Sequence, residues 1–287
     1  MTDNMNIQWY PGHMTKTRRQ IEADLKLVDA VCEIVDARIP VSSRNPDIDA
    51  ICGEKPRMIV LNRTDLADPA ATKRWAEYFK KKGMAVIATD CKTKKGISAF
   101  TPAARLACAE KLERDAKRGM SRPLRVMVVG IPNVGKSTFI NSYAGRACAK
   151  TGNKPGVTRG NQWIRLNKEV ELLDTPGILW PKFEDPQVGI RLAVLGSVKD
   201  DILNSDELAV ELLRRLRAAY PEALSERYGE AVLAGSEAEA LMEIARARNC
   251  ILKGGEPDYS RAAKLLIDDF RGGRLGRITL ELPEQDD

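Results

Sequence analysis

The sequence Gly130-Ile131-Pro132-Asn133-Val134-Gly135-Lys136-Ser137 has the pattern G-x-x-x-x-G-K-S and decides the fold. It follows the apolar run 126–129, which predicts a strand, and leads into 138–141, which predicts the start of a helix. In this strand–loop–helix setting the glycines let the backbone wrap closely around phosphates, and the N–H groups at the helix N-terminus face the anion. The stretch therefore predicts a nucleoside triphosphate site.

Two side chains of this loop carry the chemistry of phosphate binding. Lys136 is long enough to reach the outer phosphates, and the Ser137 hydroxyl is a suitable Mg²⁺ ligand. The position of the loop is unusual, because such a loop commonly opens its domain and here more than a hundred residues precede it. Further nucleotide contacts are expected from Asn133, Val134, Gly135 and Thr138.

The length and composition restrict the class of protein. With 287 residues, the chain suits two domains or one large one and can bury a core. The single histidine, His13, excludes a metal site of clustered histidines, and the six cysteines lack C-x-x-C spacing, so reduced thiols are expected. No apolar run could span a membrane, and the N-terminus lacks signal-peptide features. We expect a cytoplasmic protein without a membrane partner.

The positive charge is unevenly distributed. Residues 1–180 hold 31 Lys/Arg and 19 Asp/Glu, a net charge of +12, whereas residues 181–287 hold 15 and 21, a net charge of −6. Such a basic excess is compatible with a nucleic-acid surface, through attraction to phosphates. It is equally compatible with a solvated basic face together with residues that bind the nucleotide.

Alternating strand and helix patterns predict an α/β fold. Short apolar runs at 31–35, 58–61, 85–88 and 126–129 predict buried strands, with helices expected over 69–82 and 97–118 and a hairpin over 162–166 and 170–173. We therefore predict a mostly parallel sheet flanked by helices, in a domain over 1–182. Beyond it the apolar residues follow a helical period, which predicts a smaller all-α domain over 183–287.

Two further motifs select the nucleotide. Asp174-Thr175-Pro176-Gly177 follows a predicted strand, where Asp174 would hold Mg²⁺ through water and Gly177 would sense the γ-phosphate. Asn62-x-x-Asp65 also follows a predicted strand, at the edge where α/β sheets bind ligands. Its carboxylate can accept both N–H groups of guanine's Watson–Crick edge, which adenine does not present. Each motif alone consists of residues that are common in turns. Together with the phosphate loop, the two motifs indicate that the bound nucleotide is GTP or GDP.

The motif set resembles the ribosome biogenesis GTPase A family (RbgA, or YlqF), whose GTPase domain is circularly permuted. As in that family, the base-reading motif precedes the phosphate loop, and the similarity extends over nearly the whole chain. The residues that carry it are Trp9-Tyr10-Pro11-Gly12-His13-Met14-x-Lys16, Asp36-Ala37-Arg38-Ile39-Pro40, the phosphate loop, Thr175 to Phe183, and Asp269-Phe270-Arg271-x-Gly273-x-Leu275-Gly276.

The resemblance also assigns the base contacts. Asn62, Arg63, Thr64 and Asp65 take the place of the base motif, although the family usually has Lys where Arg63 stands. The guanidinium fork of arginine differs from an ammonium, so guanine affinity is expected to change. The segment 89–92, with Asp90 and Cys91, takes the place of the last base loop by order and position, but matches its usual sequence poorly.

The catalytic machinery is likewise implied by the resemblance. Ile178 stands where many GTPases have the glutamine that orients the attacking water, and it cannot hydrogen-bond. The family's motif histidine corresponds to His13, which implies a catalytic or water-positioning role; the alternative is a structural residue of a Pro-Gly turn. Asn133 corresponds to an asparagine that ligates K⁺ in K⁺-dependent GTPases, or else stabilises its loop. Thr158 is the candidate switch threonine that closes on Mg²⁺.

The resemblance implies a GTPase that hydrolyses GTP during a late step of large (50S) ribosomal subunit assembly. Its partner would be a precursor of that subunit, which contains rRNA and ribosomal proteins. Binding to this particle would stimulate GTP hydrolysis, and the enzyme itself would be a monomer. Three alternatives remain at this point. They are a GTPase acting on the small subunit or a tRNA-related complex, a kinase or ATPase that uses the phosphate loop, and a binding module with an inactive nucleotide site.

Overall fold

The computed structural model describes residues 14–149, 161–165, 167–177, 183, 185–198 and 204–283. Six strands form one sheet in the order β3-β2-β1-β4-β6-β5, in which every neighbouring pair is parallel except the antiparallel pair of β5 and β6. This confirms the predicted mostly parallel sheet. The strands are β1 (Ala30–Asp36), β2 (Arg57–Asn62), β3 (Ala85–Thr89), β4 (Leu124–Val129), β5 (Gln162–Arg165) and β6 (Val170–Asp174).

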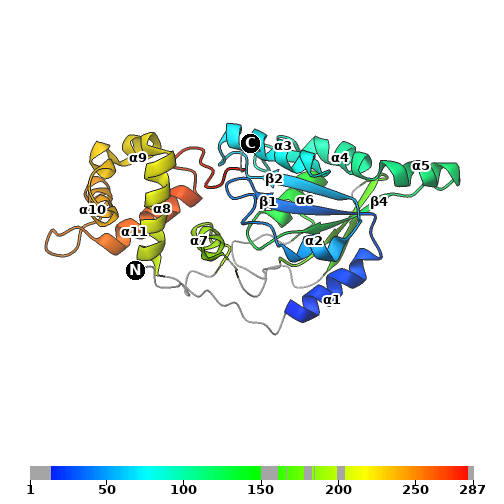
Figure 1. Ribbon diagram of the computed structural model, residues 1–287, viewed down its shortest axis with the longest axis horizontal. Helices are drawn as coiled ribbons and strands as arrows, with labels where there is room; N and C mark the ends of the chain where they lie inside the picture. The colour runs from blue at the N-terminus through cyan, green and yellow to red at the C-terminus, as the bar shows by residue number, and fades with distance from the viewer. Residues whose placement is uncertain are drawn as a thin grey trace.

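Helices cover both faces of the sheet (Figure 1). Alternate strand residues point to opposite faces, and the two sets pack against different helices. One face packs against α1 (Met14–Leu25), α2 (Asp47–Cys52) and α3 (Pro69–Lys81). The other packs against α4 (Phe100–Ala107) and α6 (Lys136–Ala144).

The helix expected over 97–118 is interrupted. The short 3₁₀ helix η2 (Ile97–Ala99) leads into α4, and α5 (Ala109–Lys117) begins only after a break at Cys108. Cys108 is the last residue that this segment buries in the core, and α5 itself has no buried residue. The single-helix prediction was therefore wrong at the point where the apolar face ends and the chain extends past the sheet.

A second, helical part follows the sheet (Figure 1). In Figure 1, α7 lies between the sheet and the other helices of this part. The predicted apolar faces are buried, with Leu208, Leu212 and Leu216 on α8 as an example. The elements are α7 (Pro186–Val194), α8 (Ser205–Ala219), α9 (Pro221–Tyr228), the 3₁₀ helix η4 (Glu230–Leu233), α10 (Glu237–Ala247) and α11 (Tyr259–Arg271).

After α11 the chain returns to the α/β part. The residues from 274 to 283, called here the C-terminal tail, add backbone hydrogen bonds from Ile278 N–H to the Leu66 carbonyl and from Leu280 N–H to the Arg38 carbonyl. The indole of Trp75 on α3 donates to the carbonyl of Glu281 over 2.9 Å. In Figure 1 the tail accordingly runs from the helical part back to the α/β part. The tail thus fastens the two parts of the chain together.

Glu281 is the anchor of this tail. Its carboxylate accepts hydrogen bonds from the backbone N–H groups of Val41 and Ser42, at 2.8 and 3.1 Å, and from the Ser42 hydroxyl. It also forms an ion pair with Arg191 of α7 at 3.1 Å, and its side chain is 6% exposed. One carboxylate therefore holds the loop after β1, the tail and α7.

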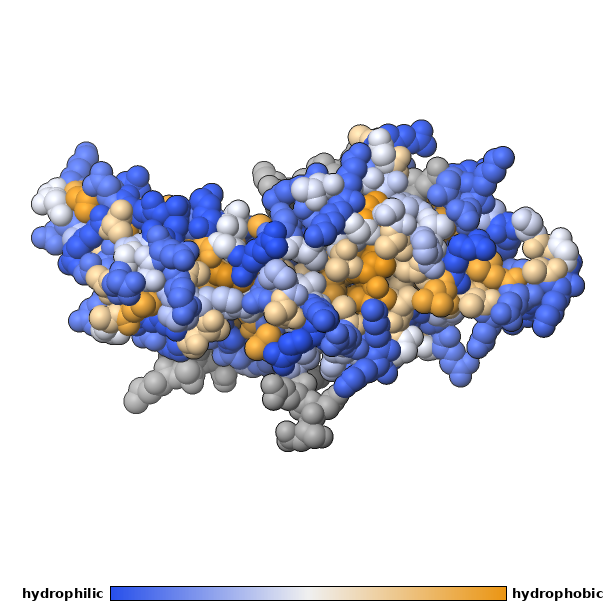
Figure 2. All heavy atoms as spheres, turned by 90° about the horizontal axis from the view of Figure 1, so that it is seen from above, coloured by the Kyte–Doolittle hydropathy of each residue, from blue (hydrophilic) through white to orange (hydrophobic). Residues whose placement is uncertain are grey.

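Membrane-spanning helices, disulfides and surface hydropathy were the remaining features to compare with the sequence. No helix in the described part of the chain is both long enough and apolar enough to span a membrane. All six cysteines are free, as expected. Seen from above, hydrophobic residues show mainly over the α/β part, with hydrophilic residues around them (Figure 2).

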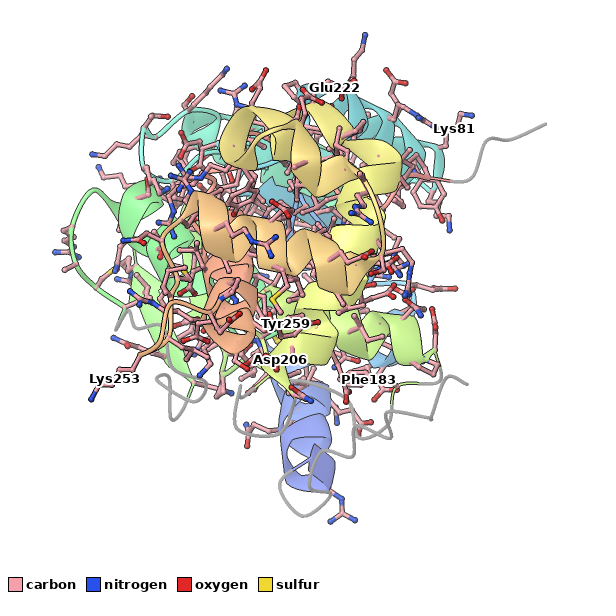
Figure 3. The ribbon with its side chains drawn as sticks, turned by 90° about the vertical axis from the view of Figure 1, so that its left-hand side faces the viewer. Lys81, Phe183, Asp206, Glu222, Lys253 and Tyr259 are labelled. Atoms are coloured by element: carbon pink, nitrogen blue, oxygen red, sulfur yellow. The ribbon has the colours of Figure 1, made fainter. Side chains whose placement is uncertain are left out.

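We predict that Glu281→Ala destabilises the protein, because it removes the ion-pair partner of Arg191 and the acceptor of two backbone N–H groups. Breaking a buried ion pair from one side costs about 3 kcal/mol or more, or roughly 6–12 °C in Tm. Thermal unfolding followed by circular dichroism measures the loss. Glu222→Ala, at an exposed position of α9 (Figure 3), is the matched control and should change Tm by only a few degrees. Equal Tm values for the two variants would contradict the anchoring role.

Candidate functional site

The phosphate loop lies at the C-terminal end of β4 and continues into α6, as predicted. Gly135 precedes α6 with φ 91°, a left-handed conformation that favours glycine. A Cβ atom there would lie 2.5 Å from the Asn62 side-chain nitrogen. Glycine is therefore needed both for the backbone turn and for the contact between the phosphate loop and the base motif.

Lys136 is buried inside the loop that it belongs to. Its ammonium donates to the carbonyls of Gly130 and Ile131 at 3.0 and 3.2 Å. Burial lowers the pKa of Lys136 to about 8, and the charge of Asp174 opposes that shift. A desolvated cation in a glycine-rich loop is stabilised by a nearby anion, so the geometry suits phosphate.

Asp174 ends β6 beside this lysine. Its Oδ1 atom is buried and has no hydrogen-bond partner within the described part of the chain. Burial raises the pKa of Asp174 to about 6, and the positive charge of Lys136 opposes the shift. Asp174 interacts with Lys136, the residue before the half-buried Ser137. An orphaned carboxylate oxygen and a hydroxyl are both oxygen ligands, so these two side chains fit a hydrated Mg²⁺.

The turn after Asp174 is fixed to the strand of the phosphate loop. The Thr175 hydroxyl donates to the Val128 carbonyl on β4 over 2.8 Å. A Cβ atom on Gly177 would lie 2.9 Å from both the Lys136 ammonium and the Pro132 nitrogen. Glycine is thus required where this turn approaches the loop, as expected of a segment that contacts the outermost phosphate. The anchoring role of Thr175 was not predicted from the sequence.

Asn62 joins the predicted base motif to the phosphate loop. Its side-chain amide donates to the Val134 carbonyl over 2.8 Å. Its Oδ1 atom accepts from the Thr89 hydroxyl and from the Cys91 thiol, both at 3.1 Å. The structure therefore brings together the motif at the end of β2, the segment after β3 and the phosphate loop, which are far apart in the sequence.

Arg63 lies against the phosphate loop. It adopts φ 62°, and its terminal NH2 group donates to the Asn133 carbonyl over 2.7 Å. Its Nε lies 3.7 Å from the carboxylate of Asp36. Burial lowers the pKa of Arg63, while the charge of Asp36 opposes that shift. The guanidinium therefore bridges the end of β1 and the nucleotide loop.

The predicted guanine acceptor and the last base loop are adjacent. The Lys92 ammonium forms an ion pair with the Asp65 carboxylate at 2.8 Å, and the Lys92 side chain is 72% exposed. Such an exposed pair contributes roughly 0–1 kcal/mol, so guanine can replace the lysine at low cost. The Thr64 N–H donates to the Thr89 carbonyl over 3.2 Å, which keeps the two segments in register.

Asp90 has a different environment from the other candidate base contacts. Its carboxylate accepts from the N–H of Lys92 at 2.9 Å and from the hydroxyl of Thr93 at 2.6 Å. These hydrogen bonds hold the pKa of Asp90 below its ordinary value despite the opposing effect of burial. The side chain thus stabilises its own turn, and Cys91 is the member of this pair that contacts Asn62.

Asn133 reaches out of the phosphate loop toward the helical part. It has φ 66°, and its side-chain amide donates to the Gly196 carbonyl, just after α7, over 2.5 Å. Arg271 of α11 donates to the neighbouring carbonyls of Ala193 and Val194, both at 2.8 Å. The end of α7 therefore connects the phosphate loop to α11.

A second connection closes this path into a ring. The carboxylate of Asp36 accepts from the Arg38 guanidinium at 3.0 and 2.8 Å, and Arg38 donates to the Arg271 carbonyl over 3.4 Å. The six residues Arg63, Asp36, Arg38, Arg271, Gly196 and Asn133 are called here the polar ring. Sequence reasoning found Asp36 and Arg38 only as part of a family motif and gave no sign of their contact with α11.

Three catalytic or metal candidates fall outside the described residues. They are the proposed catalytic residue His13, the proposed switch threonine Thr158 and, in place of the usual glutamine, Ile178, to which no role is assigned; the two proposed roles remain predictions. Of the remaining candidates, Thr138 is exposed at the start of α6. The structure thus assembles the phosphate, metal and base motifs at one edge of the sheet.

The fold and site define a P-loop protein that binds a guanine nucleotide. Residues 125–217 match the family model of the 50S ribosome-binding GTPases. The chain is 49% identical to ribosome biogenesis GTPase A of Bacillus cereus, over 98% of this chain and 95% of that one. It therefore belongs to the ribosome biogenesis GTPase A family.

Solved structures agree with this assignment. A GDP-bound structure of TM YlqF matches with a TM-score of 0.66 and 31% identity, over 93% of this chain and 100% of that one. GNP-bound YlqF from T. maritima matches with a TM-score of 0.64 and 31% identity, over 94% and 99%. The predicted family, the GTP-hydrolysing class and the link to ribosome biogenesis are confirmed.

We predict that Asp65→Asn weakens GTP binding, because an amide cannot accept both N–H groups of guanine. Losing hydrogen bonds to a charged group corresponds to a roughly 10–100-fold weaker affinity. Xanthosine triphosphate, whose oxygen replaces the guanine amino group, should bind the variant better than the wild type. Titration with fluorescent nucleotides measures both affinities, with the exposed Glu113→Gln on α5 as the matched control. Unchanged GTP affinity in Asp65→Asn would exclude this carboxylate from base recognition.

Proposed function

We propose that this chain is a GTPase switch that drives a late step in the assembly of the large ribosomal subunit. It would act as a monomer in the cytoplasm, with a precursor of that subunit as its partner. The observation that carries the proposal is the hydrogen bond between Asn62 and the phosphate loop, which supports one common site for base recognition and triphosphate binding. The match to 50S ribosome-binding GTPases supports the choice of subunit.

The residues of the site suit GTP hydrolysis. The buried Lys136 would exchange its carbonyl partners for phosphate oxygens. Ser137 and, through water, Asp174 would hold Mg²⁺, with Thr158 closing on it; the ion would neutralise charge on the phosphates. His13 would position or deprotonate the water that attacks the γ-phosphorus, while the bond to the β–γ bridging oxygen breaks to leave GDP and phosphate.

Asn133 fits a further role in this chemistry. Its amide nitrogen is engaged by Gly196, which leaves its oxygen as the atom available to a cation beside the phosphates. Potassium at that position would add positive charge where an arginine acts in other GTPases. Equal GTP turnover in K⁺ and Na⁺ would exclude this role.

We predict that purified large subunits accelerate GTP turnover, and that His13→Ala reduces the accelerated rate by at least about tenfold while nucleotide affinity stays the same. The physical reason is that Ile178 cannot orient water, so the histidine is the remaining candidate. Phosphate release with and without 50S particles measures the rate, and nucleotide titration of the variant is the control. Unchanged turnover of the variant with 50S particles would remove His13 from the mechanism. Acceleration by 30S particles alone would assign the protein to the other subunit.

The polar ring suggests how nucleotide state could reach the helical part. Asn133 belongs to the phosphate loop and Arg63 contacts it. On the other side, Asn133 contacts Gly196 at the end of α7, and Arg38 contacts Arg271 of α11. A γ-phosphate that moves the loop therefore acts on the bonds that position the helices.

We predict that the helical part changes orientation between the GDP and GTP-analogue forms. Small-angle X-ray scattering of the two forms should give different profiles, and a GDP sample measured twice is the control for reproducibility. Superimposable profiles would contradict a large reorientation in the free protein.

A further inference from the structure

Trp163 is an exposed tryptophan on the edge strand β5. Its side chain is 42% exposed, whereas the other aromatic side chains in the described part of the chain are buried or half-buried. The following residue, Ile164, points into the core, so Trp163 and Arg165 lie on the opposite face of the sheet. An exposed indole offers a flat apolar face and one N–H donor, the combination for which tryptophan is enriched at interfaces.

Two arginines flank this indole in a fixed arrangement. Arg125 on β4, Glu171 on β6 and Arg165 on β5 are direct cross-strand neighbours. The carboxylate of Glu171 lies 3.3 Å from Nε of Arg125 and 2.7 Å from Nε of Arg165. The Arg125 guanidinium also lies over the Trp163 ring, 5.2 Å from its centroid. We call these four residues the Trp163 surface.

The Trp163 surface is built to receive a planar anionic ligand. Glu171 engages only Nε of each arginine, so each fork keeps its terminal N–H donors for another partner. The side chains of Arg125 and Arg165 are 44% and 80% exposed. Because Glu171 fixes both guanidinium groups, less rotamer entropy is lost when they bind an oxyanion.

We propose that the Trp163 surface binds an unpaired nucleotide of RNA, with a base stacked on Trp163 and its phosphates held by Arg125 and Arg165. Aromatic side chains stack on single-stranded bases, whereas a duplex keeps its base faces covered. The net charge of +12 over residues 1–180 matches a polyanion. The identification of the partner as RNA rests on the proposed role in ribosome assembly.

A protein strand added to the edge of β5 fits these observations less well. Strand addition uses the backbone groups in the plane of the sheet. The indole and the arginines project from the face of the sheet instead, perpendicular to that edge. They face the side of the sheet that is covered, further along, by α1, whose Ile21 and Leu25 pack with Met127 and Leu173.

The test uses the full chain with GDP and a fluorescently labelled twelve-nucleotide oligouridylate, followed by anisotropy over a range of salt concentrations. Trp163→Ala should weaken binding roughly 5–150-fold, the effect of one base stack. Trp163→Phe should retain most of the affinity. Arg165→Gln should weaken binding and reduce the slope of log affinity against log salt by about 0.7.

Lys253→Gln is the matched control for the loss of one positive charge. Lys253 is exposed and points away from the molecule in the helical part (Figure 3), so both its affinity and its salt slope should match the wild type. Basal GTP turnover of Trp163→Ala should also be unchanged, which shows that the variant is folded.

Wild-type affinity of both Trp163→Ala and Arg165→Gln would overturn the proposal. So would equally strong, Trp163-dependent binding to a labelled RNA duplex of the same length. If Trp163→Ala binds the oligonucleotide normally but no longer cosediments with 50S particles, the surface belongs to a protein partner. The oligonucleotide assay is independent of GTP turnover, so failure of 50S-stimulated hydrolysis would refute the proposed function and leave this result standing.

Discussion

The buried ion pair between Asp36 and Arg38 is the interaction on which the arrangement of the two parts depends. Both residues are 1% exposed, and Asp36 accepts from the backbone N–H of Arg38 as well as from its guanidinium. Removing two charges from water costs several kcal/mol for each, and the pair is favourable only when its other polar atoms are satisfied. Burial would raise the pKa of Asp36, but the charge and hydrogen bonds of Arg38 hold it below its usual value, so the carboxylate stays ionised. The remaining terminal nitrogen of Arg38, Nη1, donates to the Arg271 carbonyl at the end of α11. The guanidinium also lies over the ring of Phe270 in the same helix. The α/β part therefore satisfies a fully buried arginine by docking the helical part.

The same pair is linked to the phosphate loop through Arg63. Asp36 is within 3.7 Å of Arg63, whose other end contacts the phosphate loop. Packed, hydrogen-bonded side chains do not deform continuously. A shift of the phosphate loop therefore breaks or forms individual contacts of the polar ring. The C-terminal tail limits how far the helical part can move, because Glu281 holds the loop after β1 and Arg191 of α7 together. Any reorientation of the helical part is thus a rotation about the point where Glu281 ties it to the α/β part. Complete separation of the two parts would require the Glu281 contacts to break.

Sequence reasoning recovered the features that are local. The strands, the apolar helix faces and the glycine-dependent phosphate loop each follow from short-range patterns, and the structure places them as expected. The bridge from Asn62 to Val134 was implied only indirectly, because its partners are 72 residues apart. The return of the tail was not foreseen, since nothing in the residues from 274 to 283 specifies that a glutamate there meets Ser42. The break at Cys108 was also missed, because the charged segment after it keeps a helical composition although none of its residues is fully buried.

Arg63, the departure from the family's usual lysine, has a physical explanation in this arrangement. A lysine presents one compact ammonium, which could contact either the Asn133 carbonyl or the carboxylate of Asp36. The guanidinium places Nε toward Asp36 and its terminal nitrogen on Asn133 at the same time. The arginine therefore closes the polar ring, because one side chain contacts both the phosphate loop and the buried ion pair of Asp36 and Arg38.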